Sequence, residues 1–273
     1  LGGVVSQGLL GPLTWLKDRG VEDISTVKEG DDVANAMGVT KFIPPEESTQ
    51  YAPKDKSNKA PPTPFPSNVP KTDATRLQHA PDYYFEAIAD KDIVITRKED
   101  GCSATFIHND GKFMICGRNY VWDEPDSGNG HYFNMAVKFK LEEKMAVLGR
   151  NLAVQGEICG PKINGNRRKV AETSFSVFDI YDIDNQRYLG HEAMYEVCEI
   201  LGLTPVPLLY HGPAPGAVSA LTVDAFLELS EATEYGPKLP AEGIVVKTDP
   251  FGEFGGRVNF KVISNKYLLK HDL

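Results

Sequence analysis

The chain of 273 residues is 41% hydrophobic and 25% charged, which is enough for one large domain or for a domain with an appendage. It holds no run of 18 apolar residues, so the sequence predicts no membrane span and no membrane partner. The net charge of −9 argues against a protein coated in positive charge for nonspecific nucleic-acid binding, but it allows a local basic surface. Two groups of basic residues would supply such a surface: Lys162, Arg167, Arg168 and Lys169, and Arg257, Lys261, Lys266 and Lys270.

The first 43 residues are typical of the end of a small β-rich module. Residues 1–10 are expected to form a strand already in progress, and because the chain also lacks an initiator Met, we expect further sequence upstream. Residues 31–38 indicate one or two helical turns that stop at Gly38. Residues 44–70 contain eight prolines among Lys, Ser and Asn, which predicts a linker or an extended strap and places a domain boundary there.

The remaining residues alternate strands with helices. A hairpin is expected around Asn109-Asp110-Gly111. Runs of strands with helices outside them predict an α+β domain of mostly antiparallel sheets with flanking helices. Helices are expected at 82–89, 131–148, 192–201 (ending at Gly202) and 223–230, and strands at 93–96, 104–108, 112–117, 152–158, 174–181, 244–247 and 257–263.

The four cysteines show no CxxC spacing, and three of them lie in apolar, strand-like segments. They predict reduced, buried thiols rather than a zinc site. No signal peptide is visible in this sequence. An intracellular protein, cytoplasmic or nuclear, is therefore expected. The cysteines are Cys102, Cys116, Cys159 and Cys198.

The tetrapeptide Lys98-Glu99-Asp100-Gly101 is the most informative local motif. Alone it is weak, because a lysine that leads into a glycine turn is common on protein surfaces. Two companions follow it, Glu242-Gly-Ile-Val-Val-Lys247 and Phe260-Lys261-Val262. A lysine at a strand end, a carboxylate–lysine pair and a third lysine would together build a phosphate-handling pocket that can form a covalent lysine–nucleotide intermediate.

With these motifs in this order, the chain resembles the covalent nucleotidyltransferase superfamily of ligases and capping enzymes. The resemblance is closest to ATP-dependent RNA ligases that place an OB domain before the catalytic domain. It implies a nucleotidyltransferase domain (an ATP-grasp-like ligase domain) over residues 71–273. The C-terminal part of an OB-like domain would cover residues 1–43, followed by the linker at 44–70.

The resemblance makes Lys98 the nucleophile that attacks the α-phosphorus of ATP. An ordinary lysine has a pKa near about 10.4, and nearby cations lower it. Lys247, Lys261 and a bound Mg²⁺ (or Mn²⁺) would supply that field. Asp100 and Glu242 would position the metal, in part through its waters, because Mg²⁺ keeps much of its hydration shell.

Further family motifs imply nucleotide contacts. Arg118 would contact the nucleotide or an incoming phosphate, or be an ordinary surface arginine. Glu157, in Gln155-Gly-Glu-Ile-Cys-Gly160, would accept hydrogen bonds from ribose hydroxyls, or lie exposed on a β-bulge. Phe178 would stack on adenine, or belong to the core. The implied nucleotide-binding set is Glu99, Arg118, Glu157, Phe178, Lys247, Lys261 and Arg76.

Three features leave this interpretation open. Glu242 and Lys247 lie five residues apart, so a regular strand would point them to opposite faces. The family often has a second lysine two positions after Lys261, where this chain has Ile263. Arg76, and with it Lys71, would touch ATP phosphates, but Thr72 or Asp73 in the same segment would equally serve as a helix cap.

Within the superfamily, three features favour an RNA ligase. Ser103 stands where DNA ligases usually carry an arginine, the OB-like stretch lies upstream, and only 12 residues follow Lys261. The resemblance implies nick sealing or repair of RNA with 3′-hydroxyl and 5′-phosphate ends through lysyl-AMP, by a monomer. The alternatives are a DNA ligase, a capping-type nucleotidyltransferase, and an inactive nucleic-acid-binding module.

Overall fold

The computed structural model describes residues 14–18, 24–28, 33, 62–126, 128–214, 221–249 and 257–271. The chain divides into two compact units, residues 1–60 and 61–273. The described part of the first unit holds the short helix α1 (Thr14–Asp18) and the 3-10 turn η1 (Ile24–Thr26). The strand expected at 1–10 and the helical turns expected at 31–38 lie outside the described residues, apart from Val33. Among the described helices, none is both long and apolar enough to cross a membrane.

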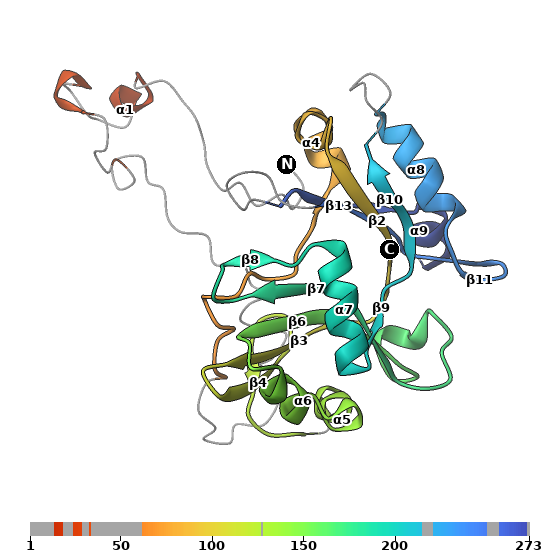
Figure 1. The fold of residues 1–273 in the computed structure, drawn as a ribbon. Coiled ribbons are helices and arrows are strands. Elements are labelled where there is room, and N and C mark those ends of the chain that lie inside the picture. Colours follow the sequence, from red (N-terminus) through yellow and green to blue (C-terminus); the bar gives the residue numbers. More distant parts are fainter. Residues whose placement is uncertain are drawn as a thin grey trace. The chain divides into compact units, whose positions relative to one another are not determined.

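The second unit is built around two sheets (Figure 1). In the smaller sheet, β13 (Gly243–Thr248) lies between β2 (Asp92–Lys98) and β14 (Asn259–Ile263) and is antiparallel to both. The edges are β10 (Leu208–Pro213), antiparallel to β2, and β1 (Thr75–Arg76), parallel to β14. Because β1 alone runs parallel to its neighbour, the predicted mostly antiparallel arrangement is confirmed for this sheet.

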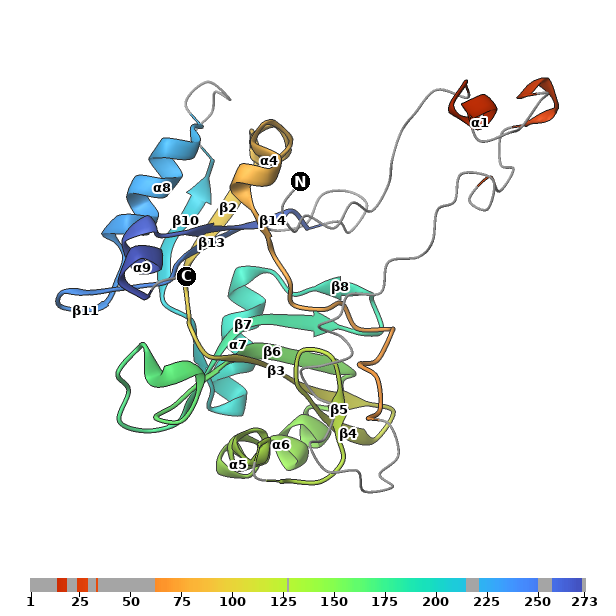
Figure 2. The ribbon, with the colours of Figure 1, turned by 180° about the vertical axis from the view of Figure 1, so that it is seen from behind.

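Helices cover one face of the smaller sheet. The core there joins α4 (Pro81–Ile88) and α8 (Val223–Ala232) to alternate strand residues. These strand residues are apolar and buried: Ile93, Ile95, Ile244, Val246, Phe260 and Val262. The short turn η2 (Leu77–His79) precedes α4, and α9 (Asn265–His271) lies beside α8 (Figure 2). We call the opposite face of this sheet its inner face; the candidate site lies on it.

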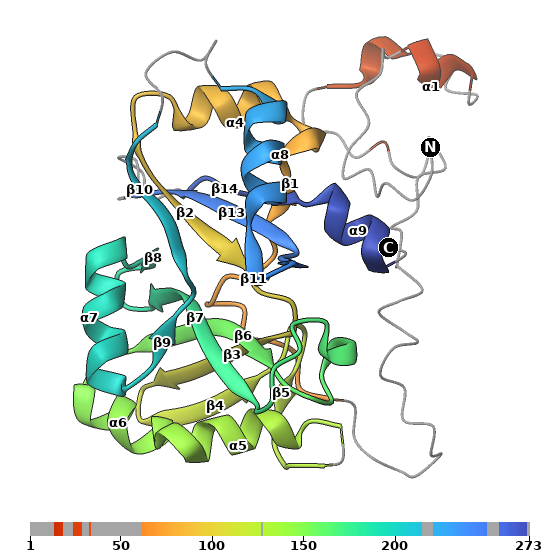
Figure 3. The same ribbon diagram turned by 90° about the vertical axis from the view of Figure 1, so that its right-hand side faces the viewer.

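The larger sheet has the order β5-β4-β3-β6-β7-β8, with β9 (Thr204–Pro205) paired to β7. Its antiparallel strands are β3 (Cys102–Asn109), β4 (Lys112–Cys116), β5 (Val121–Trp122), β6 (Leu152–Cys159), β7 (Ser174–Asp182) and β8 (Arg187–Tyr188). Helices α5 (Gly130–Phe139), α6 (Leu141–Leu148) and α7 (His191–Leu201) pack on one face (Figure 3). The other face is its inner face. A 3-10 turn, η3 (Asn164–Asn166), follows β6, and a hairpin of β11 (Glu234–Gly236) and β12 (Leu239–Pro240) follows α8.

Turn chemistry explains the predicted hairpin. Asp110 and Gly111 have φ angles of 49° and 73°, and Asn109 pairs with Lys112 across the turn. Two successive residues with positive φ form the type I′ geometry that matches the twist of paired strands. The hairpin prediction is confirmed, as is the end of α7 at Gly202, whose φ is 70°.

The helix expected over residues 131–148 is wrong in one respect, because the segment forms two helices. Lys140 adopts a left-handed conformation, with φ of 52°, between α5 and α6. This break redirects the chain so that both helices reach the core, since Leu141 and Met145 of α6 are buried there together with Met135 of α5. The periodic apolar pattern runs through the break and gives no sign of it.

The predicted linker at 44–70 needs a correction at its C-terminal end. Phe65 and Val69 are buried against the larger sheet, in a core with Ile107 and Tyr181. Backbone hydrogen bonds of 2.9 Å join Phe65 N to Asn119 O and Val121 N to Thr63 O. The strap alternative therefore describes residues 62–70, and the compact unit begins at Pro61 rather than at residue 71.

Gly243 offers a test of how tightly the strands of the smaller sheet approach. A Cβ at this position would lie 2.0 Å from the carbonyl oxygen of Val262, and the backbone φ is 155°. Gly243→Ala is therefore expected to lower the free energy of unfolding by about 1–3 kcal/mol through overpacking. Urea denaturation would measure this loss. Gly236→Ala is the control, because a Cβ there meets nothing within 4 Å; equal stability of the two variants would contradict the prediction.

Candidate active site

Strand register brings the predicted basic residues onto the inner face of the smaller sheet. Arg76 pairs with Lys261, Lys261 with Val245, and Lys98 with Gly243. Directly paired residues share a face, and residues two apart on one strand also share it. Because Ile244 and Val246 face the helices, the side chains of Lys98, Lys247, Lys261 and Arg76 belong to the inner face.

A β-bulge orients the facing residues of the larger sheet. Gln155 of β6 pairs with Asp179, and Gly156 pairs with Val177, so Phe178 is the extra residue. Val177 and Ile180 both lie in the core beneath the helices. The bulge therefore turns both Phe178 and Asp179 toward the inner face, which is a common use of such irregularities near functional sites.

Lys247 connects the inner faces of the two sheets. Its Nζ donates to the Phe178 carbonyl oxygen at 2.7 Å and to Asp179 Oδ1 at 2.9 Å, and it lies 5.4 Å from the centre of the Phe178 ring. Arg257 also binds Asp179, through Nη2 and Oδ2 at 2.6 Å. The sequence predicted Lys247 as a phosphate contact, whereas the structure pairs it with Asp179. The sequence named Arg257 only as part of a basic surface, whereas its side chain is 5% exposed, and it did not single out Asp179, because only the fold brings the two together.

These three charges are buried and interdependent. Burial, together with the charge of Arg257, lowers the pKa of Lys247 to about 8 against the attraction of Asp179. Burial alone would raise the pKa of Asp179, but the charges of Arg257 and Lys247 outweigh it and hold that pKa below its ordinary value. Buried charges of this kind are tolerated only when they are paired.

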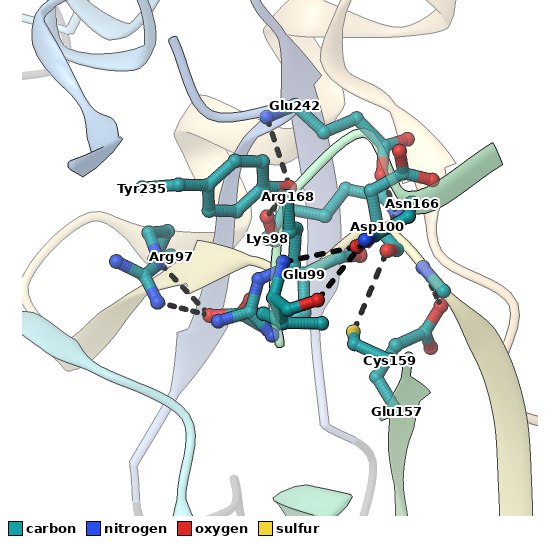
Figure 4. A network of polar contacts seen from close by, with 12 residues as sticks. Arg97, Lys98, Glu99, Asp100, Glu157, Cys159, Asn166, Arg168, Tyr235 and Glu242 are labelled. Carbon is teal, nitrogen blue, oxygen red and sulfur yellow. Dashed lines mark hydrogen bonds and ion pairs between the residues drawn. The ribbon is translucent and has the colours of Figure 1, made fainter. Parts of the chain in front are cut away.

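Lys98 ends β2 and meets Glu242, which immediately precedes β13. Lys98 Nζ lies 2.7 Å from Glu242 Oε2 (Figure 4). Glu242 lies outside the regular strand, and its carboxylate reaches Lys98 Nζ on the inner face, which it therefore shares with Lys247. The apparent conflict in their five-residue spacing is thereby resolved.

The electrostatic environment of Lys98 differs from the prediction. Burial would lower the pKa of Lys98, but the carboxylates of Glu242, Glu157 and Asp100 outweigh it and raise that pKa. The prediction combined Lys247, Lys261 and a bound Mg²⁺; the protein groups alone do not lower this pKa, since the carboxylates around Lys98 have the larger effect. Lys98 is held as an ammonium group in an ion pair with Glu242.

Glu157 and Asp100 complete the carboxylates around Lys98. Glu157 Oε1 accepts a hydrogen bond of 2.9 Å from Gly101 N. Burial, and to a lesser extent the charge of Glu242, raises the pKa of Glu157 to about 7 against the opposing charge of Lys98. Asp100 is buried and accepts hydrogen bonds from Asn164 Nδ2 and Tyr267 Oη.

The carboxylates suit a hard divalent cation in their chemistry, because Mg²⁺ and similar ions prefer carboxylate oxygens and water. However, no three His, Cys, Asp or Glu residues in the described ranges form a ready-made metal cluster. Both oxygens of Asp100 already accept hydrogen bonds, and Arg167 Nη1 lies 3.6 Å from one of them. Glu242 and Glu157 therefore fit a metal better than Asp100, for which a contact through a water molecule fits better than direct coordination.

Glu99, predicted to bind nucleotide, is instead committed to two arginines. Its side chain is only 1% exposed; Arg97 Nε donates to Oε1 at 2.8 Å, and Arg168 Nη1 lies 2.7 Å from Oε2. A carboxylate enclosed in this way is expected to stabilise the fold rather than to meet a ligand.

Arg118, Arg76 and Lys261 lie nearer to solvent. The Arg118 side chain is 65% exposed and lies 2.8 Å from Asp73 Oδ1, and Arg76 is exposed on β1. Burial and then the charge of Lys98 lower the pKa of Lys261, against the attraction of Glu242. The capping alternative for Thr72 and Asp73 is wrong, because the residue that caps α4 is Ala80 and Thr72 Oγ1 lies 2.8 Å from Ser103 Oγ.

Removing the Asp179 carboxylate tests the ion cluster between the sheets. Asp179→Asn is expected to lower the free energy of unfolding by about 3–5 kcal/mol at pH 7, because Lys247 and Arg257 lose their shared anion. The control is Asp73→Asn, whose exposed pair with Arg118 is expected to contribute less than about 1 kcal/mol. Urea denaturation of both variants would measure the difference.

The loss of stability in Asp179→Asn is expected to depend on pH. Since the folded-state pKa of Asp179 is lowered, its stabilising contribution is complete above the unfolded-state value of about 3.9 and is lost as the pH falls through the folded-state value. The difference in free energy of unfolding between wild type and Asp179→Asn should therefore narrow in acid, as the Asp179 carboxylate takes up a proton. A difference that stays constant down to acid unfolding would contradict this assignment.

Comparison with known proteins identifies the family of the chain. The model of the RNA ligase family matches residues 91–263. Naegleria gruberi RNA ligase solved with pyrophosphate superposes with a TM-score of 0.68 at 29% identity, covering 92% of this chain and 70% of that one. Two alanine mutants of the same ligase, each solved with ATP and Mn, have TM-scores of 0.68 at 29% and 31% identity; both matches cover 100% of this chain, and 74% and 76% of those chains. A search of curated proteins found no match. The chain belongs to the RNA ligase family.

Proposed function

We propose that the protein is an ATP-dependent RNA ligase that joins 3′-hydroxyl and 5′-phosphate ends through a covalent lysyl-AMP at Lys98. The observation that carries this proposal is the ion pair of Lys98 Nζ with Glu242 Oε2, at 2.7 Å, on an inner face that also holds Lys261 and Arg76. Membership of the RNA ligase family supports the same reaction.

In the first step, Lys98 Nζ attacks the α-phosphorus of ATP. A P–N bond forms, the bond from the α-phosphorus to the bridging oxygen breaks, and pyrophosphate leaves. The amine must first lose a proton. Glu242 Oε2 lies within hydrogen-bond distance of Nζ, so it is placed to accept that proton.

In the next two steps the adenylyl group is transferred and then released. An oxygen of the RNA 5′-phosphate attacks the lysyl-AMP phosphorus and restores the free amine. The 3′-hydroxyl then attacks the activated 5′-phosphate, forms the phosphodiester and releases AMP. All three steps are phosphoryl transfers, so the protein contributes mainly position and charge.

We propose ATP and Mg²⁺ or Mn²⁺ as cofactors, in keeping with the Naegleria ligase structures that contain ATP and Mn. Glu242 and Glu157 would hold the metal, with Asp100 reaching it through water. When bound there, a divalent cation supplies positive charge that neutralises phosphate oxygens. This chain's carboxylates would orient that charge beside Lys98.

The nucleotide would be held mainly by groups on the inner faces. Phe178, fixed through its carbonyl by Lys247, offers an aromatic face for adenine, and such stacking contributes about 1–3 kcal/mol. In the alternative to its metal role that the resemblance implies, Glu157 would accept hydrogen bonds from ribose hydroxyls. Lys261, Arg76 and Arg118 would contact phosphates of ATP or of RNA.

The first test is covalent labelling. The wild type incubated with α-labelled ATP and Mg²⁺ or Mn²⁺ is expected to carry label that survives SDS and is released by acid, as a phosphoramidate is. Lys98→Ala should carry none. Lys91→Ala, at an exposed lysine just before the same strand, should label like the wild type. Absence of label on the wild type with retained RNA binding would favour the inactive binding module.

The second test is end specificity. On nicked duplexes that differ only in the sugar at the 3′-hydroxyl end, a ribose is expected to be sealed faster than a deoxyribose. At RNA concentrations below saturation, the rate of sealing measured on gels should also fall as the salt concentration rises, because phosphate contacts are electrostatic. Equal rates for both sugars would reopen the DNA ligase alternative.

A further inference from the structure

Tyr235 lies against both groups of the Lys98–Glu242 pair (Figure 4). Its hydroxyl donates to the carbonyl oxygen of Lys98 at 2.9 Å and accepts from the backbone N–H of Glu242 at 3.2 Å. One phenol thus joins the end of β2 to the residue just before β13, which are the backbone points that carry the amine and its carboxylate.

The ring of Tyr235 is held by two arginines. The guanidinium carbons of Arg97 and Arg168 each lie 5.1 Å from the ring centre, a distance at which cations are attracted to an aromatic ring. Glu99 pairs with both arginines, and Arg97 Nη1 also donates to the Glu234 carbonyl oxygen at 3.2 Å. Arg97 and Glu99 flank Lys98 in the chain, so two of the three residues that hold the tyrosine ring adjoin the nucleophile.

The hydroxyl keeps its proton in this environment. Burial raises the pKa of Tyr235, and the negative charges of Glu99, Glu242 and Asp100 act in the same direction. A neutral phenol can donate to one partner while it accepts from another, which is what its two contacts require.

We propose that Tyr235 is a positioning residue for lysine adenylylation, which sets the distance between the Lys98 amine and the Glu242 carboxylate through their backbones. This inference rests on the proposed function. Lys98 is the last residue of β2, where it pairs with Gly243, and Glu242 immediately precedes β13, with its carbonyl oxygen bonded to Ser264 N at 2.9 Å. The Tyr235 hydroxyl adds a direct link between the backbones of these two residues. Small misplacements of a nucleophile greatly lower its reactivity. The two hydrogen bonds of the Tyr235 hydroxyl are therefore expected to affect the rate of adenylylation.

The test compares Tyr235→Phe with Tyr83→Phe, a control at a tyrosine that is 61% exposed on α4. Tyr235→Phe keeps the ring contacts and removes only the hydroxyl. The single-turnover rate of self-adenylylation at saturating ATP is expected to fall about tenfold, as the loss of one or two hydrogen bonds near the reacting group would produce. The ATP concentration at half-maximal rate should change by less than about twofold, because binding groups are untouched.

A second readout separates positioning from general damage. Joining of a strand supplied with its 5′-phosphate already adenylylated does not need attack by Lys98, so Tyr235→Phe should slow it less than self-adenylylation. The melting temperature should stay near that of the wild type. If Tyr235→Phe fails to fold, Glu99→Gln replaces it, since it weakens the hold of both arginines and should lower the adenylylation rate in the same direction.

The outcomes are distinct. A wild-type rate of self-adenylylation in Tyr235→Phe, or in Glu99→Gln where Tyr235→Phe does not fold, overturns the inference. Equal losses in adenylylation and in joining of the pre-adenylylated strand also overturn it. A wild type that takes no label in the presence of ATP and metal overturns the proposed function itself.

Discussion

The ion pair between Lys98 and Glu242 is the interaction on which the site depends. It joins two strand ends that are 144 residues apart in the chain, and it lies among carboxylates that outweigh the effect of burial on the amine. These contacts position the lysine and favour its protonated form. In the proposed reaction, the positive charge of a divalent cation that binds with ATP would offset the carboxylates that hold the ammonium form.

A second buried electrostatic group has a different purpose. Asp179 binds Lys247 and Arg257 between the sheets, and Lys247 also holds the carbonyl of Phe178 at the bulge. Burial is the main reason that the pKa of Lys247 falls to about 8, and the charge of Arg257 acts in the same direction against the attraction of Asp179. The chemical centre and the proposed purine platform are thus fixed by separate ion clusters, so that a change in one need not disturb the other.

The sequence predicted the features that depend on local chemistry. Asp110 and Gly111 determine the hairpin, Gly202 ends α7, and the order of Lys98, Glu242 and Lys261 points to the family. Features that depend on tertiary contacts were not predictable. The bulge that turns Phe178 follows from strand register, the commitment of Glu99 follows from Arg168 in a distant loop, and the raised pKa of Lys98 follows from three carboxylates that meet only in the fold. Tyr235 gave no signal, because a tyrosine in a short hairpin has no motif.

A chain with a net negative charge can still have a positive electrostatic potential near its site, because the sign of the local potential depends on which charged side chains remain unpaired. The nearby carboxylates are directed inward: Glu99 pairs with two arginines, Asp179 with Lys247 and Arg257, and Asp100 accepts two hydrogen bonds. Within the described ranges, Lys261 and Arg76 form no ion pair, although they lie side by side in the sheet, on the same face as Lys98. Arg76 is exposed and Lys261 is half-buried, so both cations are open to a phosphate that approaches this face. The net charge of −9 therefore describes the chain as a whole, whereas the proposed path of the polyanionic substrate is governed by the pairing of each acidic side chain.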